Sequence, residues 1–309
     1  MKFKVANHIY RPAGNESWSL SHAQVPFAMN HPDGFIRIFY ATRDADSASC
    51  TAFIDVASDD PSRILHRHDR PVLSRGKPGY FDDSGTMPSW VIPCGDRLRL
   101  YYTAWNKSRE ASYRLSIGVA ESEDFGESFT KLYEGPILDR SIHDAIWVGQ
   151  PAVMQDDGIW KMWYLSCEKI EYIDDHPEPF YNVKYATSDD GIEWRRNGEI
   201  CIPFQHDRGV DAIGRPFVFK QDSLFMMLHS NRSARGYRSD PEKSYSIACS
   251  ESRDGIVWTP TSLMIEGLDA DWCNVMNEYS SLLVCGDRTY LFFNGNGFGE
   301  SGFGYAVRV

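Results

Sequence analysis

Short apolar runs that begin after a proline recur along this chain at nearly regular intervals. Pro26, Pro88, Pro151 and Pro216 stand 62, 63 and 65 residues apart, and Ser280 takes the equivalent place 64 residues further on. Each run is followed by a short turn rich in Asp and Gly and then by an aromatic segment, which is typical of antiparallel hairpins. The chain has no helical periodicity of useful length. The pattern predicts five repeats of about 62 residues, each made of short strands.

Three of the repeats carry a similar turn after their third strand. Residues 188–194 and 252–258 read Ser-x-Asp-Gly-x-x-Trp, and residues 122–129 are a looser copy. Asp and Gly favour the tight turn, and the aromatic ring covers its apolar side. We therefore interpret these turns as structural hairpins rather than as catalytic motifs.

Five repeats of four strands predict an all-β fold, a five-bladed β-propeller with four-stranded antiparallel blades. The last repeat has only three strands before the chain ends at Val309. The segment from Phe3 to Ala6 can supply the missing fourth strand, which would close the ring and leave no open sheet edge. We expect residues 1–309 to form a single propeller domain.

Composition narrows the classes of partner. Lys and Arg number 32 against 43 Asp and Glu, a net charge of −11, which argues against nucleic acid as a ligand. No apolar run approaches the roughly 20 residues that span a bilayer, and the N-terminus lacks an apolar signal segment, so we expect no membrane insertion and a cytoplasmic location. The seven cysteines show no Cys-x-x-Cys spacing and fit reduced thiols.

The longest polar loops are predicted to lie together on one face. In a propeller, the loops between second and third strands share a face with the crossings from blade to blade, and both sets are long in this chain. Function usually concentrates where long loops meet on a rigid scaffold, so we expect a polar funnel there. The residues expected to bind a ligand in it are His22, Arg43, Asp44, Trp105, Arg215, His229, Asn231, Arg232 and Asn294.

The proline-started inner strands, the Trp- and Tyr-rich second strands and the turns at 188–194 and 252–258 together resemble a known group of enzymes. They are similar to the five-bladed propeller glycosidases, glycoside hydrolase families 43, 32, 68, 62 and 130. The resemblance covers essentially the whole chain and is closest to uncharacterised family-43/32-like proteins of bacterial surface-polysaccharide gene clusters. It implies a glycosidase-like hydrolase, transglycosidase or phosphorylase of polysaccharide metabolism.

The resemblance also implies two catalytic Asp residues and one Glu around the inner-strand prolines, and this sequence departs from that pattern. Val25, Ser89 and Gly149 occupy the three positions. A pair of flanking carboxylates is still needed for glycoside hydrolysis. The carboxylates available from the crossings, and hence the candidate catalytic residues, are Asp83, Asp144, Asp211 and Glu278.

Carboxylates crowded into one funnel should have pKa values that split apart. Glu278 has apolar neighbours in the sequence, so we expect it to be the protonated acid. Asp83 is followed by Ser84 and Gly85, so we expect it to be exposed and ionised, and hence the better base.

Arg43, Arg215 and Arg232 are many cations for a neutral-sugar site. Guanidinium groups suit carboxylates and phosphates, so an acidic, phosphorylated or nucleotide-linked sugar fits the predicted funnel. Two alternatives stay open: a non-catalytic sugar-binding propeller, which the missing triad favours, and a different reaction on an activated sugar that uses His22 and Glu278. No cofactor is expected, and the sequence leaves open a metal ion in the funnel and the oligomeric state.

Overall fold

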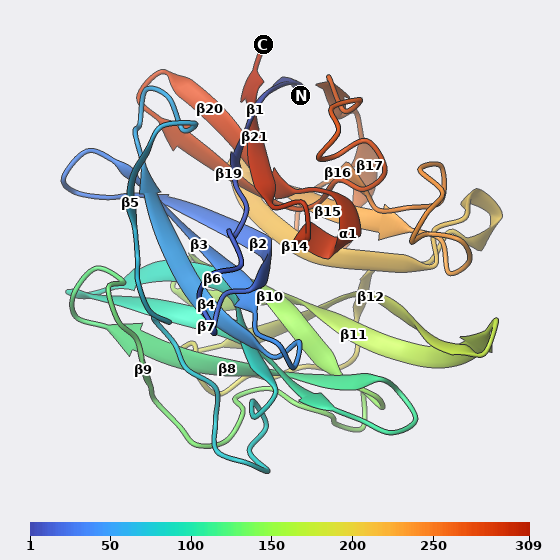
Figure 1. The fold of residues 1–309 in the computed structure, drawn as a ribbon. Helices are drawn as coiled ribbons and strands as arrows, with labels where there is room; N and C mark the ends of the chain where they lie inside the picture. Colours follow the sequence, from blue (N-terminus) through green and yellow to red (C-terminus); the bar gives the residue numbers. More distant parts are fainter.

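The computed structural model describes all 309 residues, and its regular elements are almost all β-strands, arranged around a central axis (Figure 1). The first blade holds β2 (Ser21–Asn30), β3 (Ile36–Arg43), β4 (Ser49–Val56) and β5 (Ile64–Arg67). The second holds β6 (Gly85–Cys94), β7 (Arg97–Lys107), β8 (Tyr113–Ser122) and β9 (Thr130–Lys131). The third holds β10 (Val148–Asp156), β11 (Ile159–Ile173), β12 (His176–Ser188) and β13 (Ile200–Ile202).

The fourth blade follows the same plan, with β14 (Ala212–Gln221), β15 (Leu224–Arg232), β16 (Ser246–Ser252) and β17 (Thr259–Thr261). The fifth contains β19 (Glu278–Cys285), β20 (Arg288–Asn294) and β21 (Phe303–Arg308). The helical elements are η1 (His206–Arg208) and α1 (Asn296–Gly299), and neither has the length or hydropathy that crossing a membrane requires. The five predicted repeats are thus confirmed as five antiparallel blades.

The N-terminal strand completes the fifth blade, as the sequence predicts. β1 (Lys2–Tyr10) pairs antiparallel with β21, with Phe3 opposite Arg308 and Val5 opposite Ala306. On its other side β1 pairs in parallel with β18 (Met264–Glu266). The two chain ends therefore lie side by side, as Figure 1 shows, and the first and last segments of the chain share one sheet.

Four of the five inner strands have a bulge at the residue before the proline position, whereas in β6 the register shifts after it, between Pro88 and Trp90. Val25, Gln150, Arg215 and Tyr279 adopt positive φ angles of 53°, 45°, 39° and 57°, and strand pairing shifts register at the same places. A left-handed conformation is unfavourable for such bulky residues, so the surrounding structure must hold it in place. A bulge redirects side chains from the sheet, here toward the axis of the propeller.

At each of these bulges the backbone N–H donates a hydrogen bond to a side-chain oxygen of another blade. Asn294 Oδ1 accepts from Val25 N–H at 2.9 Å, and Thr103 Oγ1 accepts from Gln150 N–H at 2.7 Å. The N–H groups of Arg215 and Tyr279 are satisfied in the same way, by Gln150 Oε1 and Ser230 Oγ. The chain therefore fixes the shape of its central channel through contacts between neighbouring blades.

The Ser-x-Asp-Gly-x-x-Trp turns also form hydrogen bonds with the neighbouring blade. The backbone carbonyl of Gly191 accepts a hydrogen bond from Tyr101 Oη at 2.8 Å, and that of Gly255 accepts one from Trp163 Nε1 at 2.6 Å. Gly191 has φ +75°, and a Cβ there would lie 2.7 Å from Tyr101 Oη. Glycine is needed at this turn both for its conformation and for the close approach of the ring.

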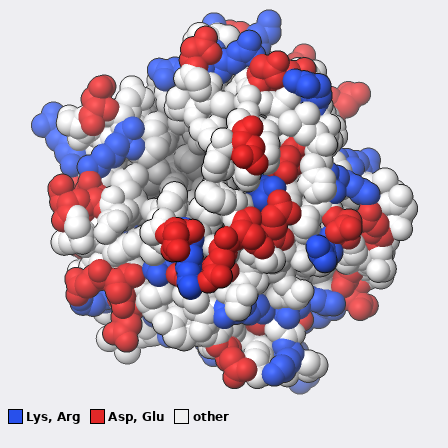
Figure 2. Space-filling model, turned by 90° about the vertical axis from the view of Figure 1, so that its left-hand side faces the viewer, with Lys and Arg blue, Asp and Glu red and all other residues white.

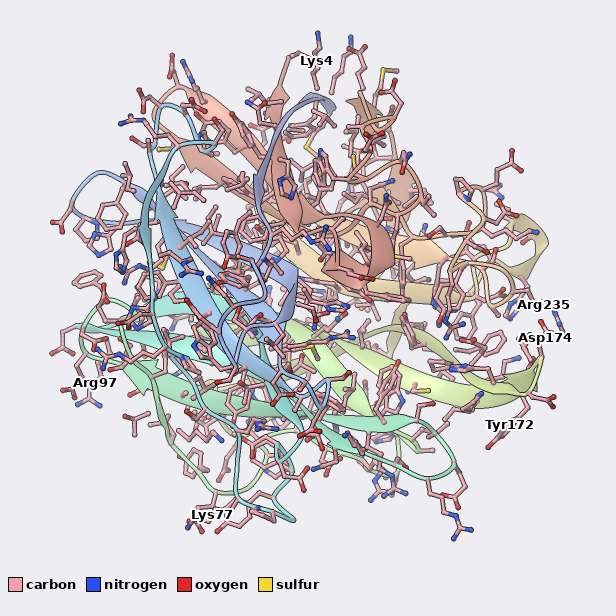
Figure 3. All side chains as sticks on the ribbon, in the orientation of Figure 1. Lys4, Lys77, Arg97, Tyr172, Asp174 and Arg235 are labelled. Carbon is pink, nitrogen blue, oxygen red and sulfur yellow. The ribbon has the colours of Figure 1, made fainter.

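The short turns and the long loops lie on opposite faces of the molecule. In Figure 3, Arg97 beside a short turn lies at the left, whereas Tyr172, Asp174 and Arg235 from the long loops lie at the right. Figure 2 shows the short-turn face, on which acidic and basic side chains are interspersed. Arg97, for example, forms ion pairs with Glu121 and Glu123.

Candidate functional site

A cavity of about 340 Å³ opens at the centre of the long-loop face, where the predicted funnel was expected. All five blades contribute to its lining, because the bulges and the ends of the second and third strands meet there. No Asp or Glu is among its lining residues. The lining residues on which the site depends are Gln24, Arg43, Trp105, Tyr113, Trp147, Gln150, Tyr181, Arg232, Tyr237, Tyr245 and Tyr279.

Arg43, the last residue of β3, brings a positive charge to this cavity without a carboxylate partner. Its Nη2 donates a hydrogen bond to Gln24 Oε1 at 3.0 Å, and no acidic side chain forms an ion pair with it. Burial lowers the pKa of Arg43 from its ordinary value, although nearby Tyr279 and Glu278 oppose this shift. A half-buried, unpaired guanidinium is costly, so the site is prepared for an anion.

Arg232, the last residue of β15, is the second unpaired cation. Its Nε donates to Tyr245 Oη at 3.1 Å, and its Nη2 donates to the Pro179 carbonyl at 2.9 Å. The guanidinium lies over the ring of Tyr237, 4.0 Å from the ring centroid, and near the rings of Tyr181 and Tyr245. These contacts fix the orientation of the cation but do not neutralise it.

Arg238 completes the cationic lining but is already paired. Its guanidinium contacts the Glu178 carboxylate, which also accepts a hydrogen bond from Tyr237 Oη at 3.0 Å. Glu178 lies outside the cavity lining. Arg43 and Arg232 are therefore the two lining cations without a carboxylate partner; Arg232 is almost fully buried, and its Nη1 also donates to the Ser233 carbonyl at 2.9 Å.

Glu278 lies in the wall beside the cavity and is fully buried. Its Oε1 accepts a hydrogen bond from Asn294 Nδ2 at 2.9 Å, while Oε2 has no hydrogen-bond partner. Burial raises the pKa of Glu278 to about 8, against the opposing effects of its hydrogen bonds and of Arg232 and Arg43. Glu278 is thus a carboxylic acid that keeps its proton at neutral pH.

Arg215 and His22 lie near the cavity, though neither is part of its lining. Arg215 is buried: Nη2 donates to the Pro26 carbonyl at 3.2 Å, Nη1 has no partner, and burial lowers its pKa to about 9. His22 contacts Ser21 Oγ at 2.9 Å, and burial together with Arg43 and Arg11 lowers its pKa to about 3. Its imidazole is therefore neutral at physiological pH.

Three of the candidate catalytic residues lie away from the cavity. Asp144 is buried, ion-paired with Arg196 at 3.1 Å and Lys184 at 3.5 Å, and bonded by Ser166 Oγ at 2.7 Å. Asp211 contacts His206 Nδ1 at 2.5 Å and the Ala234 N–H at 2.8 Å, in a separate surface pocket. Both carboxylates are occupied by groups of the protein itself.

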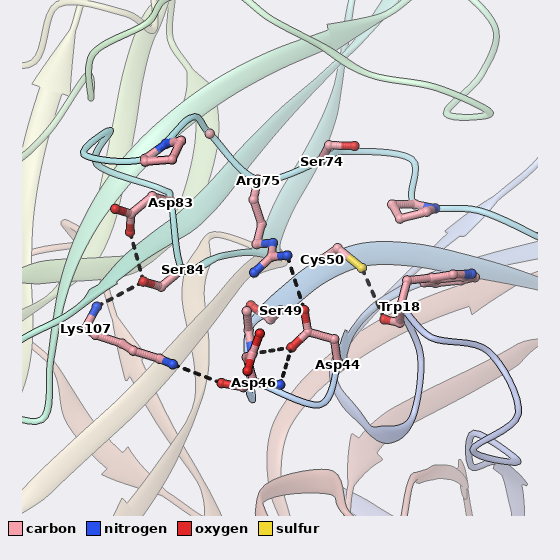
Figure 4. A pocket seen from close by; sticks show the side chains of 14 residues that line it. Trp18, Asp44, Asp46, Ser49, Cys50, Ser74, Arg75, Asp83, Ser84 and Lys107 are labelled. Carbon is pink, nitrogen blue, oxygen red and sulfur yellow. Dashed lines mark hydrogen bonds and ion pairs between the residues drawn. The ribbon is translucent and has the colours of Figure 1, made fainter.

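Asp83, the third, lines a polar groove of about 980 Å³ beside the cavity, together with Asp44 (Figure 4). Asp44 forms an ion pair with Arg75 at 3.2 Å. Burial alone would raise the pKa of Asp83, but the hydrogen bonds that it accepts from Asn106, Gly79 and Ser84 outweigh it and lower the pKa. Asp83 is therefore ionised, as expected, but in a different hollow from Glu278.

His229 and Asn231 form a buried network within the fourth blade. His229 Nδ1 contacts Asn231 Oδ1 at 2.9 Å, and Nε2 contacts Ser250 Oγ at 3.0 Å. Neither residue lines the cavity. Of the residues expected to bind a ligand, Arg43, Trp105 and Arg232 line the cavity, and Asn294 holds Glu278 beside it.

The sequence pattern does not indicate the cluster of tyrosines around Arg232. Tyr181 and Tyr245 come from neighbouring blades, and their hydroxyl groups are hydrogen-bonded to each other. The signal that could have found them is the position of these rings at the loop ends of strands. The structure brings together no group of three or more His, Cys, Asp or Glu suited to a metal ion, and all seven cysteines are free.

Comparison with known proteins establishes the fold of this chain but not its family. No family model matches the chain. An uncharacterised protein of Mycobacterium tuberculosis, Rv1502, is 29% identical over 310 residues, which cover 99% of both proteins.

Solved structures match over nearly the whole length. A glycosyl hydrolase from Bacteroides ovatus has a TM-score of 0.74 at 15% identity, covering 99% of this chain and 93% of that protein. A second match has a TM-score of 0.69 at 15% identity and covers 99% of this chain and 93% of that protein. It is described as belonging to the GH130 family of mannoside phosphorylases, which contains glycoside hydrolases that target β-1,2 mannosidic linkages in Candida mannan. A complex of BT0996 with RGII has a TM-score of 0.70 at 14% identity and covers 98% and 91%. The protein therefore has the fold of the five-bladed propeller glycosidases.

Proposed function

We propose that this protein is a carbohydrate-active propeller whose central cavity binds an anionic sugar unit, either a sugar acid or a sugar phosphate. The observation that carries the proposal is the pair of guanidinium groups of Arg43 and Arg232, which face one cavity without any carboxylate in its lining. Guanidinium groups bind carboxylates and phosphates through paired charge-assisted hydrogen bonds. The aromatic rings around them suit the apolar faces of a sugar ring.

The fold supports a sugar as the carrier of this charge. Structures of the same fold are described as a glycosyl hydrolase, as part of a family of mannoside phosphorylases and glycoside hydrolases, and as a complex with RGII. Identities of 14 to 15% carry no substrate from those proteins to this one. The evidence for an anionic ligand is the pair of cations, Arg43 and Arg232.

The reaction that fits one carboxylic acid and two unpaired cations is phosphorolysis. Hydrolysis by the usual route needs two carboxylates flanking the bond, and of the two buried carboxylates beside the cavity Glu178 is paired with Arg238, which leaves Glu278. In this reaction the anion bound by Arg43 and Arg232 is inorganic phosphate rather than a charged group of the glycan, and it would attack the anomeric carbon of a neutral terminal unit. A carbon–oxygen bond to phosphate forms, the glycosidic bond breaks, and the leaving oxygen takes the proton from Glu278. The products are a sugar phosphate and a shortened glycan.

A non-catalytic sugar-binding propeller is the second candidate. It is favoured by the absence of Asp and Glu from the lining and by the full burial of Glu278, which places the carboxyl behind the cavity surface. In that case Glu278 keeps the wall neutral so that an anion is not repelled, and the bound sugar is not altered.

A two-stage experiment tests the proposal. First, thermal-shift titrations compare glucuronate, galacturonate, glucose 6-phosphate and inorganic phosphate with neutral glucose and galactose. Anions should raise the melting temperature of the wild type, and Arg43→Met should abolish this increase. Equal increases with neutral and anionic sugars would overturn the proposal. Second, mass spectrometry follows oligosaccharides incubated with phosphate. Release of a sugar phosphate that Glu278→Gln prevents, while anion binding persists, identifies the enzyme, and binding without turnover identifies the binding module.

A further inference from the structure

The proposed function does not use the polar groove beside the central cavity. Its volume of about 980 Å³ lies at the upper end of the range for ligand sites, about 300–1,000 Å³. It runs between the first two blades on the long-loop face. In Figure 4, Trp18 lies at one end, Asp83 and Lys107 lie at the other, and the Arg75–Asp44 ion pair lies between them.

The tip of the hairpin between β3 and β4 lies between the groove and the cavity. Arg43 faces the cavity, whereas the next residue, Asp44, faces the groove. Ser49 lines both hollows, and its Oγ accepts a hydrogen bond at 2.8 Å from Nε1 of Trp105, a cavity residue. The two hollows thus share a wall in which Ser49 itself is buried, and a ligand longer than the cavity would pass over the hairpin tip to reach the groove.

The two hollows differ in charge. The cavity lining holds three arginines and no acidic residue. The groove lining holds Asp44, Asp46 and Asp83 against Arg75 and Lys107, so three acidic and two basic residues leave a net charge of −1. An anionic group is attracted to the cavity and gains nothing from the groove, while the groove presents donors and acceptors suited to neutral hydroxyl groups.

The polar groups of the groove are held in fixed orientations. Asp83 accepts hydrogen bonds from Asn106 Nδ2 at 2.7 Å and from the Gly79 N–H at 2.9 Å. Asp44 Oδ1 accepts from the N–H groups of Asp46 and Ala48, each at 2.9 Å. Pre-oriented polar groups bind a ligand without a large loss of side-chain entropy. Half-buried Trp18 adds the aromatic ring that sugar sites commonly contain.

The cavity is closed at its far end, which decides which part of a glycan it can hold. Below the bulges, Phe27, Trp90 and Phe217 from three blades pack together, with ring centroids 5.3 Å apart for Phe27–Trp90 and 4.9 Å apart for Trp90–Phe217. A glycan cannot pass through this aromatic plug, so only the end of a glycan enters the cavity.

We infer that the groove binds the neutral sugar units that follow an anionic unit in the central cavity, so that the ligand is an oligosaccharide with an anionic residue at one end. This inference rests on the proposed function, because it takes the cavity as the site of the anionic unit. It adds the length of the ligand, the position of its charge and a second binding region formed by Trp18, Asp83 and Lys107.

Calorimetric titrations test the inference with glucuronate and with gluco-oligosaccharides of two and four units that carry glucuronate either at one end or internally. Affinity should rise from the monosaccharide to the end-charged tetrasaccharide, and the internally charged one should bind at least tenfold more weakly. Asp83→Asn and Lys107→Met, which preserve side-chain size, should each weaken the tetrasaccharide by about five- to tenfold. Both should leave glucuronate affinity unchanged within twofold. Trp18→Ala should act in the same direction.

Different results would overturn the groove inference and the proposed function of the cavity. If glucuronate and the oligosaccharides bind equally well and the groove variants change neither, the groove inference is overturned while the cavity proposal stands. If neither glucuronate nor any oligosaccharide binds, the proposed function fails and the groove inference fails with it. If the circular dichroism of a groove variant differs from that of the wild type, Lys107→Gln takes its place. Lys107 is exposed, so this change should leave the fold intact.

Discussion

Asn294 Nδ2 donates a 2.9 Å hydrogen bond to Glu278 Oε1, while the second oxygen of this carboxyl, Oε2, has no hydrogen-bond partner. The same amide accepts the Val25 N–H at 2.9 Å through its Oδ1, which fixes its orientation. One side chain therefore supports both the bulge of the first blade and the buried acid of the fifth. Asn294 thereby connects the last blade to the first beside Glu278.

Stability should fall as pH rises because of Glu278. The pKa of its carboxyl is 4.5 in the unfolded chain and about 8 in the folded protein, so the folded state holds one more proton between these values. Its stabilising contribution is complete below pH 4.5 and is lost as pH rises to about 8. Glu278→Gln should remove this dependence and exceed the wild type by roughly 2 kcal/mol or more at pH 9. Urea unfolding of both proteins at pH 5.5 and 9 measures the difference, and parallel pH profiles would contradict the assignment.

Anion binding should weaken above pH 8 for the same reason. An ionised Glu278 beside Arg43 and Arg232 would offset part of their charge and repel an anionic ligand. Titration of glucose 6-phosphate at pH 7 and pH 9.5 should show a loss of affinity in the wild type and little change in Glu278→Gln. The second ionisation of the phosphate is largely complete at both values, so it does not mimic the effect. An equal loss in both proteins would exclude Glu278 as the cause.

Affinity for anions should also depend on salt. Arg43 is only half-buried, so its contact with a ligand is partly screened by dissolved ions. Raising sodium chloride from 50 to 500 mM should weaken glucuronate binding several-fold in the wild type. Arg253→Ala, a change at an exposed position on the opposite face, should keep both the affinity and the salt dependence. A loss with Arg253→Ala equal to that with Arg43→Met would show that general surface charge, rather than the cavity, binds the anion.

The turn glycines should contribute to stability through contacts between blades. Gly191→Ala puts a Cβ at φ +75° and 2.7 Å from Tyr101 Oη, whereas Gly158→Ala meets the same backbone cost, at φ +78°, in open space. The left-handed conformation alone costs roughly 1–2 kcal/mol. Chemical denaturation should therefore show a larger loss for Gly191→Ala than for Gly158→Ala. Equal losses would mean that the turn at 188–194 does not tie the second blade to the third.

The fold could be predicted from the sequence because it repeats. The prolines at a spacing of about 62 residues mark the bulges of the inner strands, which recur because each blade meets its neighbour in the same way. The missing strand of the last repeat likewise pointed to Phe3–Ala6, which lie in β1 and pair with β21.

The site was only partly predictable because pairing within the protein cannot be deduced from spacing. Arg43 and Asp144 are both charged residues at loop-proximal positions. Asp144 meets Lys184 and Arg196 from the third blade, whereas Arg43 meets no acid. Which charges are left free depends on side chains far away in sequence. The same limit applies to the tyrosines around Arg232, which look like ordinary strand residues until the blades bring them together.

The most direct test of the central claim is a calorimetric titration of glucose 6-phosphate and of glucose into the wild type, Arg43→Met and Arg253→Ala at pH 7 and low salt. Glucose 6-phosphate should bind to the wild type and to Arg253→Ala with the same affinity. Glucose should bind the wild type at least tenfold more weakly than glucose 6-phosphate does. Arg43→Met should lower the affinity for glucose 6-phosphate about ten- to hundredfold and leave the affinity for glucose unchanged. Equal affinities for glucose and glucose 6-phosphate, or an unchanged affinity in Arg43→Met, would contradict an anion site in the central cavity.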